Sequence, residues 1–152
     1  MANSQAMCTS FKQDLLNGLH AFGTSVVRAG TGADTFKGAL YLVTGSVGAA
    51  TAAYSATNEV TGANYTATGA TVTNATAPTT SGTTAFWTPS ASLTWTTVTL
   101  ATAFDALLLY NSTAAGKNSV AVYTFGSQTV TAGNLTLTMP TNDSSTGLLR
   151  LA

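Results

Sequence analysis

The stretch AFWTPSASLTWTTVTLATAFDALLLYN, residues 85–111, decides the fold, together with SVAVYTFG, residues 119–126. In both, apolar residues alternate with Thr or small residues at a period of about two. This pattern is typical of strands, because successive side chains of a strand point to opposite faces of a sheet. FDALLLYN and SVAVYTFG flank the small-residue segment STAAGK, which predicts a β-hairpin with a longer turn.

The longer run changes phase part-way along its length. Leu93 and Trp95 share one face of a strand, whereas Val98 and Leu100 share the other. An inserted residue shifts the alternation in this way, so the pattern predicts a β-bulge near residues 96–97 or, alternatively, a strand with two inner faces.

Shorter strand-like runs surround the hairpin, separated by Gly, Pro and Asn. They are TSVVRAG (24–30, a short strand or arm), DTFKGALYLVTG (34–45), NYTATGATVTN (64–74), NLTLTMP (134–140) and GLLRLA (147–152). Roughly seven or eight strands at regular spacing predict a mainly β protein, a β-sandwich of the jelly-roll or immunoglobulin-like kind. We assign the sandwich to residues 24–152 and an N-terminal helix or arm to residues 1–23, within a single domain.

The N-terminal segment MCTSFKQDLLNGLHAFG, residues 7–23, differs from the rest because it predicts one amphipathic α-helix. On a helical wheel its apolar residues form a stripe about 120° wide, the width expected of a helix that faces a core or a partner. The stripe consists of Met7, Phe11, Leu15, Leu19 and Phe22. We interpret it as a docking helix, packed either on the base of the sandwich or on a neighbouring subunit.

The predicted strands carry four aromatic residues that we expect in the core: Phe36, Trp87, Trp95 and Tyr110. Trp87 and Trp95 have a second interpretation, since sugar-binding proteins stack glycan rings on exposed aromatic side chains. In that case Trp87 would join Tyr65 or Tyr123 in an exposed cluster on an outer face.

Charge is scarce in this chain of 152 residues, of which 7% are Asp, Glu, Lys or Arg against about 25% in a typical domain. The net charge is zero, which argues against nucleic acid and anionic lipid as partners. No run of about twenty apolar residues predicts a membrane span, and the N-terminus has no secretory signal pattern. A net charge near zero favours contact between copies, so we expect a homo-oligomer, a dimer or a trimer.

Residues that carry chemistry are few. Cys8 and His20 are the only residues of their types, and they lie about 120° apart on the predicted helix, which excludes a simple nucleophile–base pair there. We predict that Cys8 is a small buried apolar residue and that His20 is a surface or interface residue without a catalytic role. The acidic residues are scattered over different elements: Asp14, Asp34, Glu59, Asp105 and Asp143.

These residues predict no catalytic site, no cofactor and no metal site. One His and one Cys are too few for zinc, although calcium held between loops stays open. We therefore expect that the protein is not an enzyme.

Four segments carry a resemblance to a known group of proteins: MANSQAMCTSFKQDLLNGLHAF, DTFKGALYLVTG, TTAFWTPSASLTWTTVTLATAFDALLLYN and FGSQTVTAGNLTLTMPTND. With them the chain resembles, over nearly its whole length, the small virion structural proteins of tailed bacteriophages. The resemblance implies a structural protein of the particle, most like a capsid decoration (cement) protein. Such proteins bind the outside of the shell as symmetric oligomers. It rests on overall pattern, so it transfers no residue roles.

The partners implied by this resemblance are the major capsid protein and further copies of the chain. The implied location is the virion, assembled in the host cytoplasm, where neither a signal peptide nor a disulfide is needed. Two alternatives stay open: a head or tail fibre module that attaches to a host glycan, and another tail or connector component.

Overall fold

The computed structural model describes residues 2–16, 18–23 and 32–152, and it is mainly β with antiparallel sheets, as predicted. The predicted arm TSVVRAG lies outside the described residues. The elements in chain order are β1 (Ala6–Met7), α1 (Thr9–Leu16), β2 (Phe36–Leu42), β3 (Ala70–Thr71), β4 (Thr79–Ser81), β5 (Thr84–Trp87), β6 (Leu93–Asn111), β7 (Ser119–Leu137) and β8 (Leu149–Leu151).

The strands form two sheets. The larger one has the order β1-β7-β6-β2-β3, and the smaller one has the order β4-β5-β8. The predicted hairpin is the centre of the larger sheet, because β6 and β7 pair along their whole lengths of 19 residues each.

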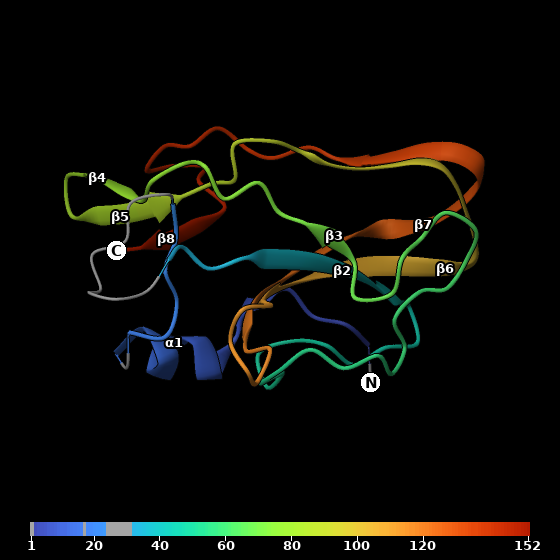
Figure 1. The fold of residues 1–152 in the computed structure, drawn as a ribbon, viewed down its shortest axis with the longest axis horizontal. Coiled ribbons are helices and arrows are strands. Elements are labelled where there is room, and N and C mark those ends of the chain that lie inside the picture. The colour runs from blue at the N-terminus through green and yellow to red at the C-terminus, as the bar shows by residue number, and fades with distance from the viewer. Residues whose placement is uncertain (1, 17, 24–31) are drawn as a thin grey trace.

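The long hairpin folds back on itself (Figure 1). The inner half consists of residues 104–111 of β6, which pair with β2, and residues 119–125 of β7, which lie on the side of β1. The outer half, residues 93–100 and 130–137, returns above the inner half as a second layer. Five register shifts interrupt the pairing of β6 with β7. Bulges bend strands and increase their twist, so this succession of shifts gives the hairpin its corner.

The predicted bulge near residues 96–97 is confirmed. Trp95 pairs with Leu135 and Val98 pairs with Gly133, so β6 contains one more residue than β7 between these two pairs. Thr97 has a φ of 51°, the left-handed conformation that a bulge can require.

The two layers touch at Gly38 in β2. A Cβ atom at this position would lie 2.6 Å from Leu93 Cδ1 of the outer half and 2.9 Å from Leu107 Cδ1 of the inner half. Glycine therefore lets the layers approach closely, and the core fills the space around this contact.

The predicted helix over residues 7–23 is wrong in its extent. α1 spans only Thr9–Leu16, and Met7 belongs to β1, where it pairs with Ala121 of β7. Gly18 has a φ of 64°, the left-handed conformation that ends many helices. The backbone N–H of Leu19 donates to the Asp14 carbonyl at 2.9 Å and closes this end.

The strand predicted over residues 64–74 is also wrong for most of its length, since only β3 forms there. Asn64, Thr68 and Gly69 have positive φ values of 60°, 78° and 74°. These left-handed residues break an extended chain into turns, and Thr-rich alternation does not reveal them.

Candidate functional site

Most side chains of the predicted docking stripe pack inside the molecule. Phe11 is buried at 2% exposure, while Met7, Leu15 and Phe22 are half-buried and pack against the core. Leu19 is also half-buried. α1 and the residues after it thus pack against the core of their own chain.

The four predicted core aromatics are all buried. The exposed fraction is at most 6% for any member of the set Phe36, Trp87, Trp95 and Tyr110. Phe22 stacks on Phe36 with ring centroids 4.4 Å apart, and its ring centroid lies 4.7 Å from that of Trp87. The arm thereby completes an aromatic cluster that begins in the sheets.

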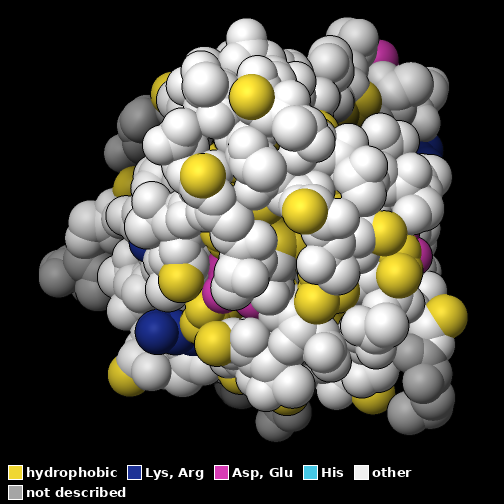
Figure 2. Space-filling view, turned by 90° about the vertical axis from the view of Figure 1, so that its right-hand side faces the viewer, with side chains coloured by type: hydrophobic (Ala, Val, Ile, Leu, Met, Phe, Trp, Pro, Cys, Tyr) yellow, Lys and Arg dark blue, Asp and Glu magenta, His cyan; other side chains and the backbone are white. Residues whose placement is uncertain are grey.

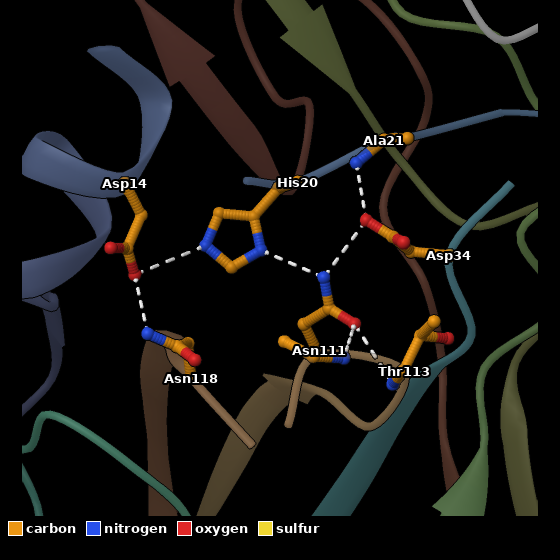
Figure 3. A network of polar contacts seen from close by, with 8 residues as sticks. Asp14, His20, Ala21, Asp34, Asn111, Thr113 and Asn118 are labelled. Atoms are coloured by element: carbon orange, nitrogen blue, oxygen red, sulfur yellow. Dashed lines mark hydrogen bonds and ion pairs between the residues drawn. The ribbon is translucent and has the colours of Figure 1, made fainter. Parts of the chain in front are cut away.

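A polar network joins the arm to the turn between β6 and β7 (Figure 3). His20 Nε2 lies 3.5 Å from Asp14 Oδ2, and the same oxygen accepts a hydrogen bond from Asn118 Nδ2 at 3.0 Å. On the other side of the ring, His20 Nδ1 lies 3.1 Å from Asn111 Nδ2, which also donates to Asp34 Oδ2 at 2.9 Å. We call these five residues the arm–turn network.

His20 was predicted to be a surface or interface residue, and the surface position is wrong because none of its side chain is exposed. The reason is the early end of α1: beyond Gly18 the chain is no longer helical, so the wheel does not apply to His20. Its ring lies instead among the rings of Phe11, Phe22 and Phe36, with centroids 4.9 to 6.2 Å away.

A His beside two carboxylates suggests acid–base chemistry, but the arm–turn network places its partners differently. General-base catalysis by His needs a nucleophile within hydrogen-bond reach. The contacts of the imidazole nitrogens shown in Figure 3 are to a carboxylate and to an amide, neither of which is a hydroxyl or thiol nucleophile. The contacts in Figure 3 link Asp14 and His20 to the turn between β6 and β7.

Cys8 is fully buried, as predicted. Burial raises the pKa of its thiol to about 11, although Ser119 nearby acts in the opposite direction. A thiol that stays protonated near neutral pH is a poor nucleophile. Cys8 is therefore a packing residue.

A second buried polar cluster surrounds Glu59. Its two carboxylate oxygens accept hydrogen bonds from Tyr54 Oη at 2.6 Å and Tyr65 Oη at 2.8 Å. Burial raises the pKa of both phenols, and the Glu59 carboxylate raises them further. Tyr65 Oη also accepts from the backbone N–H of Leu40 in β2, so the cluster ties the 54–65 loop to the sheet.

An apolar hollow of about 210 Å³ opens between the arm and the small sheet. Three residues of the predicted docking stripe line one wall, namely Phe11, Leu15 and Phe22. The opposite wall includes Phe86, Trp87 and Leu151. Leu151 is 44% exposed and is the only large apolar side chain classed as exposed in the described part of the chain. We call this hollow the arm pocket.

Two further hollows lie on either side of Tyr123, whose hydroxyl donates to the Leu148 carbonyl at 3.0 Å. One, of about 260 Å³, runs between Phe125 of the inner half and Leu137 of the outer half. The other, of about 450 Å³, lies beside β1 and β8. On the β7 side the two layers therefore do not close completely.

Charged groups are sparse on the surface at the hairpin corner. Figure 2 shows this end of the molecule covered mainly by uncharged polar side chains and backbone, with small apolar side chains scattered among them. Such a surface carries no charge pattern that selects a nucleic acid or an anionic substrate.

In residues 2–16, 18–23 and 32–152, no group of three or more His, Cys, Asp or Glu side chains is placed to hold a metal ion. Within the same ranges, no helix has the length and apolar character needed to cross a bilayer.

No protein-family model, curated protein or solved structure matches the chain. The comparisons therefore assign neither a family nor an activity.

Two features of the site escaped sequence reasoning. Asn111 is the last residue of a predicted strand and Asn118 has no predicted role, although both side chains contact the N-terminal segment. A signal did exist: two Asn residues flank STAAGK, and Asn side chains commonly satisfy the backbone of turns. The arm pocket had no local signal, because its walls come from three segments that are far apart in the sequence.

Proposed function

We propose that the protein is a structural protein that works by assembly, and specifically a decoration (cement) protein on the shell of a tailed-phage particle. In this role copies of the chain bind one another and the major capsid protein, and the protein is located in the virion. The resemblance of the sequence supplies the class, and the surfaces of the fold support assembly over catalysis.

The observation that carries the proposal is the arm pocket. Its lining is almost wholly apolar, and the exposed Leu151 stands at its rim. Exposed apolar surface beside a pocket is typical of protein–protein contact. By contrast, His20 contacts Asp14 and Cys8 contacts the Gly48 carbonyl, both within the same chain.

We also propose that the folded hairpin and the small sheet form a β-sandwich of the jelly-roll or immunoglobulin-like kind. The return of the outer half above the inner half supports a layered core, which is what these architectures share.

The attachment alternative receives less support. It expects an exposed cluster of Trp87 with Tyr65 or Tyr123, but Trp87 is buried, while both tyrosines are half-buried with their hydroxyls hydrogen-bonded. A glycan has no aromatic platform among these residues.

Electron microscopy of purified particles that carry a labelled copy of the chain tests the proposal. Many regularly spaced copies on the shell are expected. A few copies at one vertex indicate a tail or connector component, and the absence of label from particles overturns a structural role.

Light scattering of the purified chain at micromolar concentration tests assembly directly. An oligomer is expected, and Leu151→Asp is expected to shift it towards monomer because a charge at the rim of the arm pocket opposes burial. Thr129→Asp, on the exposed part of β7, is the matched control and leaves the oligomer intact. A sharp monomer for the unmodified chain contradicts cement function.

A further inference from the structure

We propose that residues 133–137 of β7 form a docking edge for a second copy of the chain, whose own β7 pairs with it antiparallel across a two-fold axis. We call these residues the β7 edge. The inference rests on the part of the proposed function in which copies of the chain bind one another, and it names the strand that they share.

The first observation is that β7 has a strand neighbour on only one side over most of its length. β6 pairs with it along one side, whereas β1, its neighbour on the other side, pairs only with Ala121 and Val122. Within the described residues, the backbone of the β7 edge makes no hydrogen bond outside the β6–β7 ladder. Every second residue of this edge therefore directs its N–H and C=O groups away from β6, where a further strand can pair with them.

The β7 edge lacks the side chains that commonly block the edge of a sheet. Lys, Pro and inward-pointing charges serve this purpose in many proteins. β7 contains no charged residue and no Pro, and the next Pro along the chain is Pro140. The outer half of β7 runs along the top of the molecule in Figure 1, and its residues are exposed or half-buried.

A bulge limits the length of the regular edge. Ala132 has a φ of 46°, and its backbone N–H donates to Thr99 Oγ1 at 3.0 Å. The register of β7 against β6 shifts at this point, so the regular ladder begins at Gly133. The β7 edge is consequently about 17 Å long, the length of an ordinary strand.

The second observation is that the core is incomplete at the same edge. In the outer half of β6, Leu93 and Trp95 are buried. Their partners on β7, Leu137 and Leu135, are only half-buried. A hollow of about 260 Å³ lies between Leu137 and Phe125 of the inner half. Because burial of half-exposed apolar side chains is favourable, a strand added at the β7 edge extends both the ladder and the core.

The free backbone groups specify an extended strand as the occupant, and the charge of β7 favours a second copy of itself. A two-fold axis sets each strand opposite its own sequence, so a charged residue would face a like charge at a cost in stability. β7 carries no charge, and no such repulsion arises. An axis through Leu135 sets this residue opposite itself, with Gly133 opposite Leu137 and Asn134 opposite Thr136 of the second copy.

The two-fold axis of an antiparallel pair is perpendicular to the sheet, so the inward faces of both copies stay on the same side. Leu135 and Leu137 of one copy then adjoin those of the other, and the two hollows meet. The outer half changes from a two-stranded ribbon, which is marginally stable by itself, to a layer in the order β6-β7-β7-β6.

Amide hydrogen exchange of the unmodified chain at low and high protein concentration tests the pairing. At every second amide of the β7 edge, exchange is expected to slow by about tenfold or more at high concentration, from the gain of at least one hydrogen bond. Exchange in residues 126–129, at the hairpin corner, is expected to stay the same. Fast exchange at these β7-edge amides at both concentrations overturns the proposal.

Light scattering of the same samples separates this inference from the proposed function. An oligomer without protection of the β7 edge overturns the docking edge and leaves assembly through the arm pocket standing. A monomer at both concentrations contradicts both.

Oxidative cross-linking of Leu135→Cys tests the position of the axis. The facing Cβ atoms of an antiparallel pair lie about 5 Å apart, near enough for a disulfide between copies. Cys8 does not compete, because it is fully buried and burial raises the pKa of its thiol to about 11.

The matched control is Thr129→Cys, at an exposed position beyond the bulge. The two copies of residue 129 would lie at opposite ends of the paired strands. A covalent dimer is expected for Leu135→Cys and not for Thr129→Cys. Equal cross-linking of the two variants, or none in either, overturns an axis at Leu135, and the exchange experiment stands even if Leu135→Cys does not fold.

Discussion

The inner and outer halves of the β6–β7 hairpin belong to the same two strands, yet their environments differ. In the inner half, Ala106–Asn111 and Ser119–Val122 are buried on both faces. In the outer half, β6 alternates between buried and exposed residues, and most of β7 is exposed or half-buried. The difference shows that a strand's place in the layers, and not its membership of a hairpin, sets what each side chain contributes to stability.

The largest expected effect of a substitution comes from the inner half. Leu108→Ala removes a fully buried side chain and is expected to lower the free energy of unfolding by about 2–5 kcal/mol. Leu137→Ala, in the outer half and only half-buried, is the matched control, with an expected loss of about 1 kcal/mol. Urea unfolding measures both, and equal losses would erase the distinction between the halves.

Strand β2, which pairs with the inner half of the hairpin, contains Tyr41 opposite Ala106. Burial raises the pKa of Tyr41 to about 12, with the Glu59 carboxylate acting in the same direction and the hydrogen bond to Ser55 opposing. The unfolded phenol ionises near pH 10, so stability is intact below that pH and falls as the pH rises towards 12. We expect a loss on the order of 1–2 kcal/mol, since water screens part of the effect.

Absorbance near 295 nm, followed against pH with parallel stability measurements, checks this expectation. Tyr41→Phe lacks the ionising group and is expected to lose its share of the alkaline instability. A Tyr41 signal that titrates near pH 10 in the folded protein contradicts the burial of the phenol.

The contact between the halves is tested at Gly38. Gly38→Ala sets a methyl group against Leu93 and Leu107, which must both shift, and we expect a loss of about 1 kcal/mol. Gly126→Ala is the matched control, because no neighbouring atom lies within 4 Å of the added Cβ. If Gly38→Ala leaves the free energy of unfolding unchanged, the two layers are not in close contact at this position.

The smallest effect is expected at the exposed face of the outer half. Thr94 and Thr136 face each other across the strands, with their hydroxyl oxygens 3.2 Å apart. Replacing either by Ala is expected to cost about 0.5 kcal/mol or less, as for other exposed cross-strand pairs. A double-mutant cycle by thermal unfolding checks the pair, and a coupling well above this value would place the outer half nearer to the inner half in importance.

Much of the fold was predictable because strand periodicity is a local property. The hairpin and the bulge near residues 96–97 both follow from alternation at a period of two. Alternation and periodicity did not predict that the helix ends before Gly18, nor that most of residues 64–74 form turns instead of a strand. Both outcomes depend on residues in the left-handed conformation, and residue type alone does not reveal that choice.

By itself, then, the sequence determined that this is a mainly β protein of low charge, with a hairpin around residues 112–117 and an apolar N-terminal stripe. That residues 134–137 continue β7, and do not form a separate strand, is shown only by the structure. Only the tertiary structure decided that the hairpin folds over itself, since a corner needs bulges on two strands to act together. It also decided that His20 is buried beside Asn111, 91 residues away. Neighbours so distant are brought together by the packing of the layers, and no local pattern encodes them.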